Sequence, residues 1–99
     1  MAMTIQEVRN RIDAARRLAE AEAARVPRAP VFPLVIVGLN TVEAAIAGGP
    51  RAAYEAGRSL GVLAVRELDD GSGDRPELCD AIMRVLDGLR QLSGLQYWE

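Results

Sequence analysis

The chain has 99 residues, and its positive charge comes from twelve arginines, because lysine and histidine are both absent. Without histidine there is no imidazole base, no Ser-His-Asp triad and no histidine metal ligand, and without lysine there is no Schiff-base chemistry. The single cysteine, Cys79, excludes an internal disulfide and a multi-cysteine zinc site. We therefore predict no catalytic residue, no metal site and no cofactor, and we expect a protein that binds rather than catalyses.

The length predicts one domain, residues 1–99, with a thin core. A chain of this size buries only about 60–65% of the surface that it exposes when unfolded. Apolar residues make up 49% of the sequence, but many of them are alanine, and aromatic residues make up only 4%. Because a thin, alanine-rich core often needs a second subunit to complete it, we expect self-association, most simply as a homodimer.

Charge and hydropathy indicate the class of partner and the location. The net charge of −2 is too balanced to indicate a nucleic acid or a membrane surface as the partner. The chain opens without an apolar signal segment, and its longest apolar stretch, residues 29–49, contains prolines, an asparagine and a glutamate that disfavour a membrane span. We expect a cytoplasmic protein, and the arginine-only usage points to a GC-rich, bacterial-like composition.

Residues 4–25 carry the clearest helix pattern. Thr4 and Glu7 form a capping box, in which the threonine hydroxyl accepts the Glu7 N–H and the glutamate reaches back. Ion pairs one turn apart are expected on the solvent side, among them Arg16 with Glu20. The apolar stripe at helical spacing consists of Ile5, Val8, Ile12, Ala15, Ala19, Ala23 and Val26.

Residues 31–47 fit two interpretations. The run 31–37 is β-branched and uninterrupted, as a buried strand would be, and Asn40 could then cap a following helix. Alternatively, Pro33 lies in the first turn of one buried helix that runs to residue 47.

Residues 50–68 begin with a proline suited to the first turn of a helix. A stripe of small residues follows: Ala53, Gly57, Gly61 and Ala64. Glycine inside a helix costs about 1 kcal/mol relative to alanine, so we predict that Gly57 and Gly61 lie against another backbone segment, within the chain or across a dimer axis. In the alternative interpretation the helix ends near Gly57 and residues 60–66 form a second strand.

The acidic stretch 69–74 predicts a loop, and residues 74–94 predict a last helix that Asp74 caps and Gly94 ends. Its wide apolar face consists of Leu78, Ile82, Val85, Leu86, Leu89 and Leu92. The C-terminal tail follows with Tyr97 and Trp98, whose aromatic rings with polar tips are typical of interface anchors.

Three weaker site patterns predict ordinary structure. Loop 69–74 matches the first ligand positions of an EF-hand but lacks its glycine and its final glutamate, which indicates a solvated turn. The Gly48–Arg51 stretch could hold an anion, but Pro50 removes a donor, which favours a plain turn between helices. Cys79 lies at the edge of an apolar face, as expected of a buried and inert thiol.

The segment Thr4–Asp13 resembles the first helix of small helical chorismate mutases. The resemblance covers about a tenth of the chain and consists of residues that any capped amphipathic helix uses, so it implies no residue role and no activity.

The predicted fold is an all-α compact bundle of three to four helices. The alternative is an α+β fold with short strands near 31–37 and 60–66 that dimerisation completes.

The predicted function is a non-catalytic protein-interaction module, a small subunit or adaptor that forms a homodimer or docks on a larger partner. Gly57, Gly61, Tyr97 and Trp98 are the candidate partner-binding residues, and face 78–92 is a candidate dimer surface. The first alternative is a small enzyme that binds an anionic metabolite through arginines and a carboxylate base. The second is a nucleic-acid-binding regulator that uses the arginines of the N-terminal helix, although the interleaved acidic residues make nucleic acid an unlikely partner.

Overall fold

The computed structural model describes residues 3–68 and 76–94, and within them the chain forms four α-helices and no strand. These are α1 (Ile5–Arg25), α2 (Val31–Ala45), α3 (Pro50–Leu63) and α4 (Pro76–Ser93), with a 3-10 turn η1 (Ile46–Gly48) after α2 and a π-helical turn η2 (Ala64–Leu68) after α3. The predicted all-α bundle is confirmed. The alternative with strands near 31–37 and 60–66 is wrong, because those residues belong to helices.

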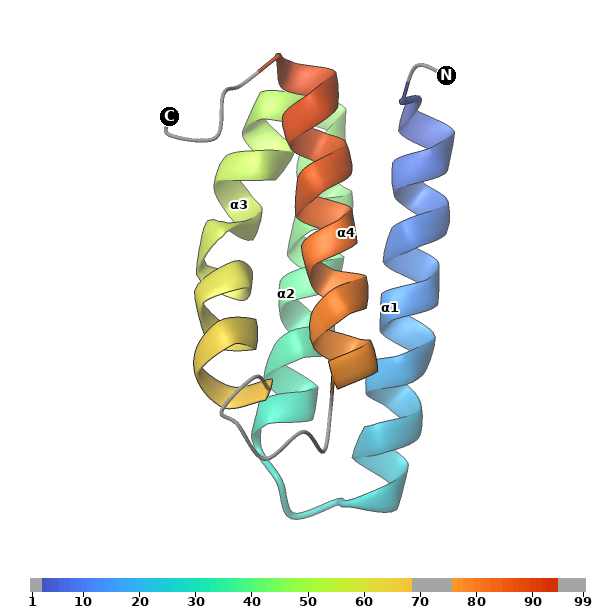
Figure 1. Ribbon diagram of the computed structural model, residues 1–99, viewed down its shortest axis with the longest axis vertical. Helices are drawn as coiled ribbons and strands as arrows, with labels where there is room; N and C mark the ends of the chain where they lie inside the picture. Colours follow the sequence, from blue (N-terminus) through green and yellow to red (C-terminus); the bar gives the residue numbers. More distant parts are fainter. Residues whose placement is uncertain (1–2, 69–75, 95–99) are drawn as a thin grey trace.

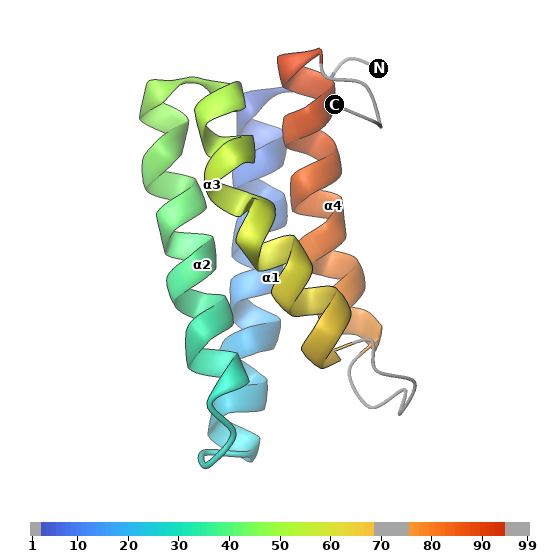
Figure 2. The same cartoon turned by 90° about the vertical axis from the view of Figure 1, so that its left-hand side faces the viewer.

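Each helix packs against the next one along the chain, and α4 closes the ring against α1. Successive helices run in opposite directions (Figure 1). Seen from the side, α3 lies between α2 and α4, with α1 behind them (Figure 2). The two seams of α3, with α2 and with α4, therefore open toward the same side of the molecule.

The first helix forms where the capping box predicts it. The Thr4 hydroxyl accepts the Glu7 N–H at 3.1 Å, which satisfies one of the free donors of the first turn. Val8 and Ile12 are fully buried, as predicted, and Ile5 is partly buried at the edge of the core. Farther along, the stripe narrows to buried alanines, which lets the neighbouring helices approach closely.

The second helix shows why the strand interpretation of 31–37 fails. Phe32, Val35, Leu39 and Val42 are its buried residues, at spacings of three and four, which is the period of a helix. Pro33 fits the first turn, where its missing N–H removes no helical hydrogen bond. Packing of this stripe overrides the β preference of the branched residues, and the expected cap residue Asn40 lies inside the helix.

The link between α2 and α3 is a tight turn. Gly49 has φ +106°, a left-handed backbone conformation that glycine adopts without strain. Pro50 then opens α3 at the position where a proline is preferred. This turn reverses the chain within a few residues and sets α3 antiparallel to α2.

Small residues on α3 receive a side chain from α4. A Cβ placed on Gly57 would lie 2.7 Å from Leu86 Cδ2, and one placed on Gly61 would lie 2.7 Å from Leu86 Cδ1. The glycines thus leave a notch that the Leu86 side chain fills. The prediction of a close approach is confirmed, but the expected neighbour is wrong: the nearest atoms belong to a side chain of the same chain, because a leucine fills the space that a second backbone would need.

The apolar face of α4 points into the bundle. Leu78, Cys79, Ile82, Val85, Leu86 and Leu89 are all buried. The expectation that face 78–92 would be free for a dimer is therefore wrong, because α1, α3 and η2 pack against this helix. Gly94, with φ +73°, follows the end of α4 and takes the left-handed conformation predicted for its stop.

The packing around the notch predicts that alanine substitutions at its two glycines lower stability by different amounts. Gly57→Ala should lower the free energy of unfolding by about 1 kcal/mol more than Gly61→Ala does. At Gly61 the new methyl group meets only the tip of Leu86, which can rotate outward, whereas at Gly57 it also meets Val42 Cγ2 at 3.1 Å, on a β-branched side chain with restricted rotation.

Urea denaturation of both variants measures the difference, and the gain in helix propensity from glycine to alanine is common to them. Equal costs, or a greater cost at Gly61, would contradict the described packing.

Candidate interaction surface

Large apolar side chains are exposed on one side of the bundle. Among the described residues these are Leu34, Val37, Val62, Val65 and Met83, which are 41–61% exposed. They come from α2, α3, η2 and α4. Single exposed apolar residues are ordinary, but these line two grooves that flank α3.

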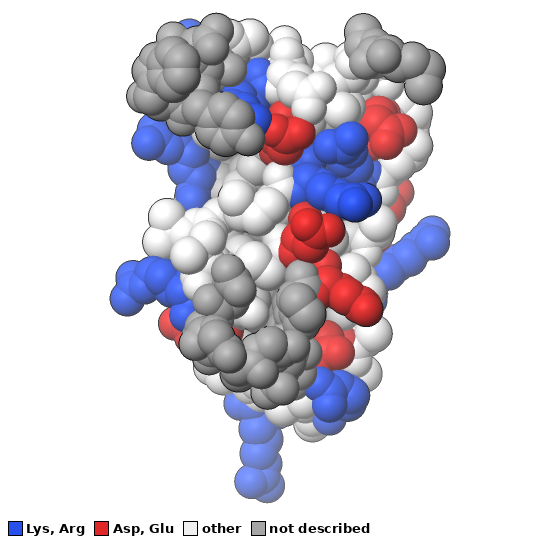
Figure 3. Space-filling model, viewed as in Figure 1, with Lys and Arg blue, Asp and Glu red and all other residues white. Residues whose placement is uncertain are grey.

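The first groove lies between α3 and α4 and has a volume of about 400 Å³. We call it the α3–α4 groove, and its lining residues are Tyr54, Arg58, Gly61, Val62, Val65, Arg66, Met83 and Leu86. Its floor is the notch, since Leu86 and Gly61 both line it. Figure 3 shows uncharged surface here, between mainly basic groups on the α3 side and a mixture of acidic and basic groups on the α4 side.

The wide π-helical turn shapes one end of this groove. Val65 and Arg66 belong to η2, and both line the groove together with Val62 of α3. A π turn is rare and occurs often at functional sites. Here it continues the wall of the groove beyond the end of α3.

The second groove lies between α2 and α3. Its lining residues are Leu34, Val37, Gly38, Thr41, Ala56, Ser59, Leu60 and Leu63, none of which is charged. Thr41 turns its hydroxyl inward along the helix and donates to the Val37 carbonyl at 2.9 Å. This groove is therefore apolar and offers few groups that would orient a ligand.

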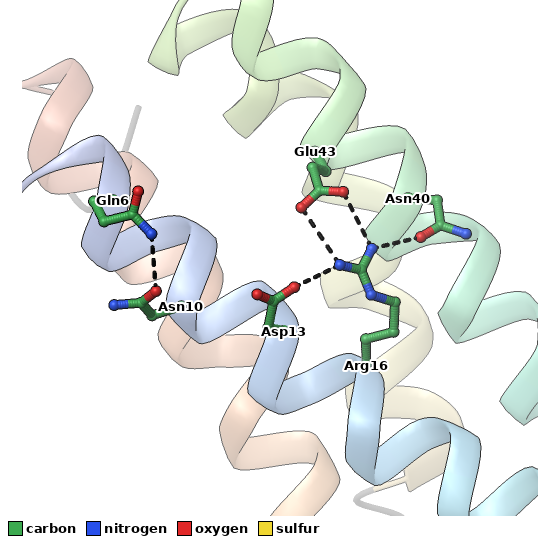
Figure 4. A network of polar contacts seen from close by, with 6 residues as sticks. All are labelled: Gln6, Asn10, Asp13, Arg16, Asn40 and Glu43. Atoms are coloured by element: carbon green, nitrogen blue, oxygen red, sulfur yellow. Dashed lines mark hydrogen bonds and ion pairs between the residues drawn. The ribbon is translucent and has the colours of Figure 1, made fainter.

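A cluster of polar contacts around Arg16, which we call the clamp, joins α1 to α2. Arg16 donates to Asn40 Oδ1 at 2.8 Å and to the two carboxylate oxygens of Glu43 at 3.2 and 3.4 Å, and it also donates to Asp13 (Figure 4). The expected pair of Arg16 with Glu20 is replaced by this set, because Glu43 offers a two-pronged acceptor that matches the guanidinium.

The clamp fixes the charge of Arg16. The hydrogen bond that the guanidinium donates to Glu43 raises its pKa above the ordinary value, partial burial opposes that rise, and Asp13 adds to it. The side chain therefore stays charged and its donors are engaged by protein acceptors. An anionic ligand would have to displace Glu43 to reach it.

Other arginines of α1 are engaged as well. Arg11 pairs with Glu7 and donates to the Arg84 carbonyl of α4, and Arg25 pairs with Glu22. These contacts reduce the positive charge that α1 could present to phosphates. Two surface pockets do bring arginines and carboxylates together: one is lined by Asp80, Arg84, Asp87 and Arg90, and the other by Arg11, Glu77, Asp80 and Arg84. The enzyme alternative therefore stays a prediction.

The predicted partner-binding residues have different outcomes. Gly61 lines the α3–α4 groove, and Gly57 lies beneath it, covered by Leu86 and Val42. Tyr97 and Trp98 lie outside the described residues. Partner binding by these four residues stays a prediction.

Sequence reasoning missed the residues that form the groove walls. Val62, Val65 and Met83 are apolar but lie off the buried stripes of their helices. Their signal is the uninterrupted apolar run 60–65, which the sequence alone also allows as a strand. A helix that is apolar on more than one face needs a second packing surface.

The weaker site patterns gain no support. The acidic loop 69–74 lies outside the described residues, and the described part of the chain contains no group of three His, Cys, Asp or Glu side chains that could hold a metal ion. The Gly49 N–H donates to the Ile46 carbonyl at 2.9 Å, so this donor is not available to an anion. Cys79 is buried, as predicted.

One stretch, Val31–Gly48, is long and apolar enough to cross a membrane by length and composition. A core helix of a soluble protein passes the same test, so a single such helix is weak evidence. In this structure the stretch packs against α1 and α3.

Comparisons of the chain with protein-family models, with curated proteins and with solved structures find no match.

The clamp predicts a measurable contribution to stability. Arg16→Met should lower the free energy of unfolding by about 1–2 kcal/mol, because Glu43 and Asp13 lose a partly buried cationic partner. Arg17→Met is the matched control on the exposed side of the same helix. Thermal denaturation of both variants checks this, and equal losses would show that the clamp contributes nothing specific.

Proposed function

We propose that the chain is a non-catalytic protein-interaction module, a small subunit or adaptor that buries the outer side of α3 against another protein surface. The observation that carries this proposal is the grouping of exposed Leu34, Val37, Val62, Val65 and Met83 in two grooves on one side of the bundle. Large exposed apolar patches mark interaction sites on soluble proteins.

The distribution of polar contacts supports the same function. Apart from the Cys79 thiol, the described core consists of apolar side chains and buries no charged group, so it offers no buried carboxylate or arginine. In the clamp between α1 and α2, Arg16 donates hydrogen bonds to protein acceptors, so it is engaged within the chain. The solvent-exposed surface beside α3 is apolar, and charged side chains border it. Protein interfaces have the same composition, with an apolar centre and a polar rim.

The proposal is tested by placing a charge in each groove. Val62→Glu and Val37→Glu should abolish capture of proteins from a lysate of the native organism, untagged copies of this chain included, because a buried carboxylate without a partner is costly. We expect at least one specifically captured protein to fall about tenfold or more with one of the two variants.

Ala21→Glu provides the matched control. It adds the same charge at an exposed position of α1, remote from both grooves, and should leave capture unchanged. Circular dichroism establishes that all variants are folded. If every captured protein is retained equally by the three variants, the outer side of α3 is not an interaction surface and the proposal fails.

A further inference from the structure

One end of the α3–α4 groove lies beside the last turn of α4. Leu86 fills the notch between Gly57 and Gly61, so it is level with the middle of that turn of α3. Because α3 and α4 are antiparallel, moving seven residues forward along α4, to Ser93, rises about 10 Å toward the top of Figure 1 and leads to the level of residue 52. Tyr54, a lining residue of the groove, is therefore close to the level of Ser93.

The chain turns away from the axis of α4 at Gly94. This residue has φ +73°, and its N–H donates to the Gln91 carbonyl at 3.4 Å, which ends the helix. Residues 95–99 follow with the sequence Leu-Gln-Tyr-Trp-Glu and lie outside the described residues. We call them the tail. Four extended residues span at most about 14 Å, so Trp98 is able to reach the level of Arg58, which lies about 9 Å below the level of Ser93.

The tail and the reachable part of the groove have complementary chemistry. Tyr97 and Trp98 have large rings with polar tips, and Glu99 carries the single charge of the tail. The reachable part of the groove offers the apolar notch as its floor, and its charged lining residue is Arg58. An apolar segment that carries one acid therefore fits a groove that carries one arginine at this level.

Arg58 keeps donors for an acidic partner. Its Nη1 pairs with Glu55 at 3.4 Å, and both side chains are more than half exposed, so this pair contributes little. A guanidinium has five N–H donors, and this contact uses only part of them. On the opposite wall, at about the same level, Asp87 is bound by Arg90 and Gln91, so its carboxylate is occupied within α4.

From this arrangement we propose that the tail folds back along the α3–α4 groove of its own chain, with Trp98 over the notch and Glu99 beside Arg58. The docking itself does not depend on the proposed function, but its consequence does. A protein that binds the α3–α4 groove has to displace the tail, while the α2–α3 groove stays open. The tail thus controls access to one of the two grooves.

The apolar contact supplies the affinity of this docking, and the ion pair supplies its direction. Val62 and Met83 are exposed side chains at the notch, and the indole ring covers them. Arg66 lines the same groove but lies eight residues beyond Arg58, about 12 Å farther along α3 and η2. It is out of reach of the tail and therefore serves as a control within the groove.

The first measurement is the fluorescence of Trp98, the single tryptophan of the chain. In the purified full-length chain its emission should lie at shorter wavelength than that of an acetylated peptide of residues 95–99. Acrylamide should quench it about twofold less or weaker still, because an indole ring on an apolar floor is shielded from the quencher. Val62→Glu should remove both differences, since it places a carboxylate beneath the ring.

The second measurement exchanges the charges of the inferred pair. Arg58→Glu should lower the ratio of docked to released tail about threefold to tenfold, because Glu99 then faces a like charge. Adding Glu99→Arg to this variant should restore the wild-type emission and quenching. Arg66→Glu makes the same change of charge out of reach of the tail, and it should leave both unchanged. Circular dichroism establishes that every variant is folded.

Three results overturn the inference. The first is a wild-type emission equal to that of the peptide, and the second is a double variant that stays released. The third is an emission that shifts with protein concentration, because the tail then docks on a neighbouring chain.

The inference and the proposed function fail separately. If Trp98 is as exposed as in the peptide while Val62→Glu still abolishes capture of another protein, the inference fails and the proposed function stands. If Trp98 is shielded while neither Val62→Glu nor Val37→Glu changes capture, the docking stands and the proposed function fails. Where both hold, Trp98→Ala should raise capture through the α3–α4 groove about threefold or more, because the competing segment is lost. Equal or lower capture would contradict control of access by the tail.

Discussion

The packing of Leu86 between Gly57 and Gly61 sets the distance between α3 and α4, and the outer surface depends on that distance. A larger residue at either glycine would separate the two helices or displace the leucine. Because the two glycines have no side chain, α4 lies close to α3 here. The exposed Val62, Val65 and Met83 therefore line one groove. The notch therefore supports both the core and the candidate interaction surface.

Polar contacts hold the opposite side of the bundle. Arg16 binds Asp13, Asn40 and Glu43 and so joins α1 to α2, while Arg11 reaches from α1 to a carbonyl of α4. These contacts are partly exposed and individually modest. They nevertheless give the molecule two unlike sides: a charged side around α1, and an apolar side around α3. The proposed interaction surface lies on the apolar side.

Some of these features could be predicted from the sequence and others could not. The cap at Thr4, the stripe of α1 and the stop at Gly94 are local patterns, and each was identified. Residues 31–37 and 60–66 remained ambiguous, because branched residues in an apolar run satisfy both a strand and a buried helix. Which residue would fill the notch is a long-range contact without a local signal. The groove was missed because Val62 and Met83 matter only once α3 and α4 lie side by side.

The most direct test of the central claim is a photo-cross-link from the wall of the α3–α4 groove. Met83→Cys, in a chain whose Cys79 is replaced by alanine, carries a thiol-attached benzophenone into this groove. Illumination in a lysate of the native organism should give specific covalent adducts that Ala21→Cys, labelled in the same background on the exposed side of α1, does not give. The same adducts in equal amount from both variants would contradict an interaction surface beside the notch.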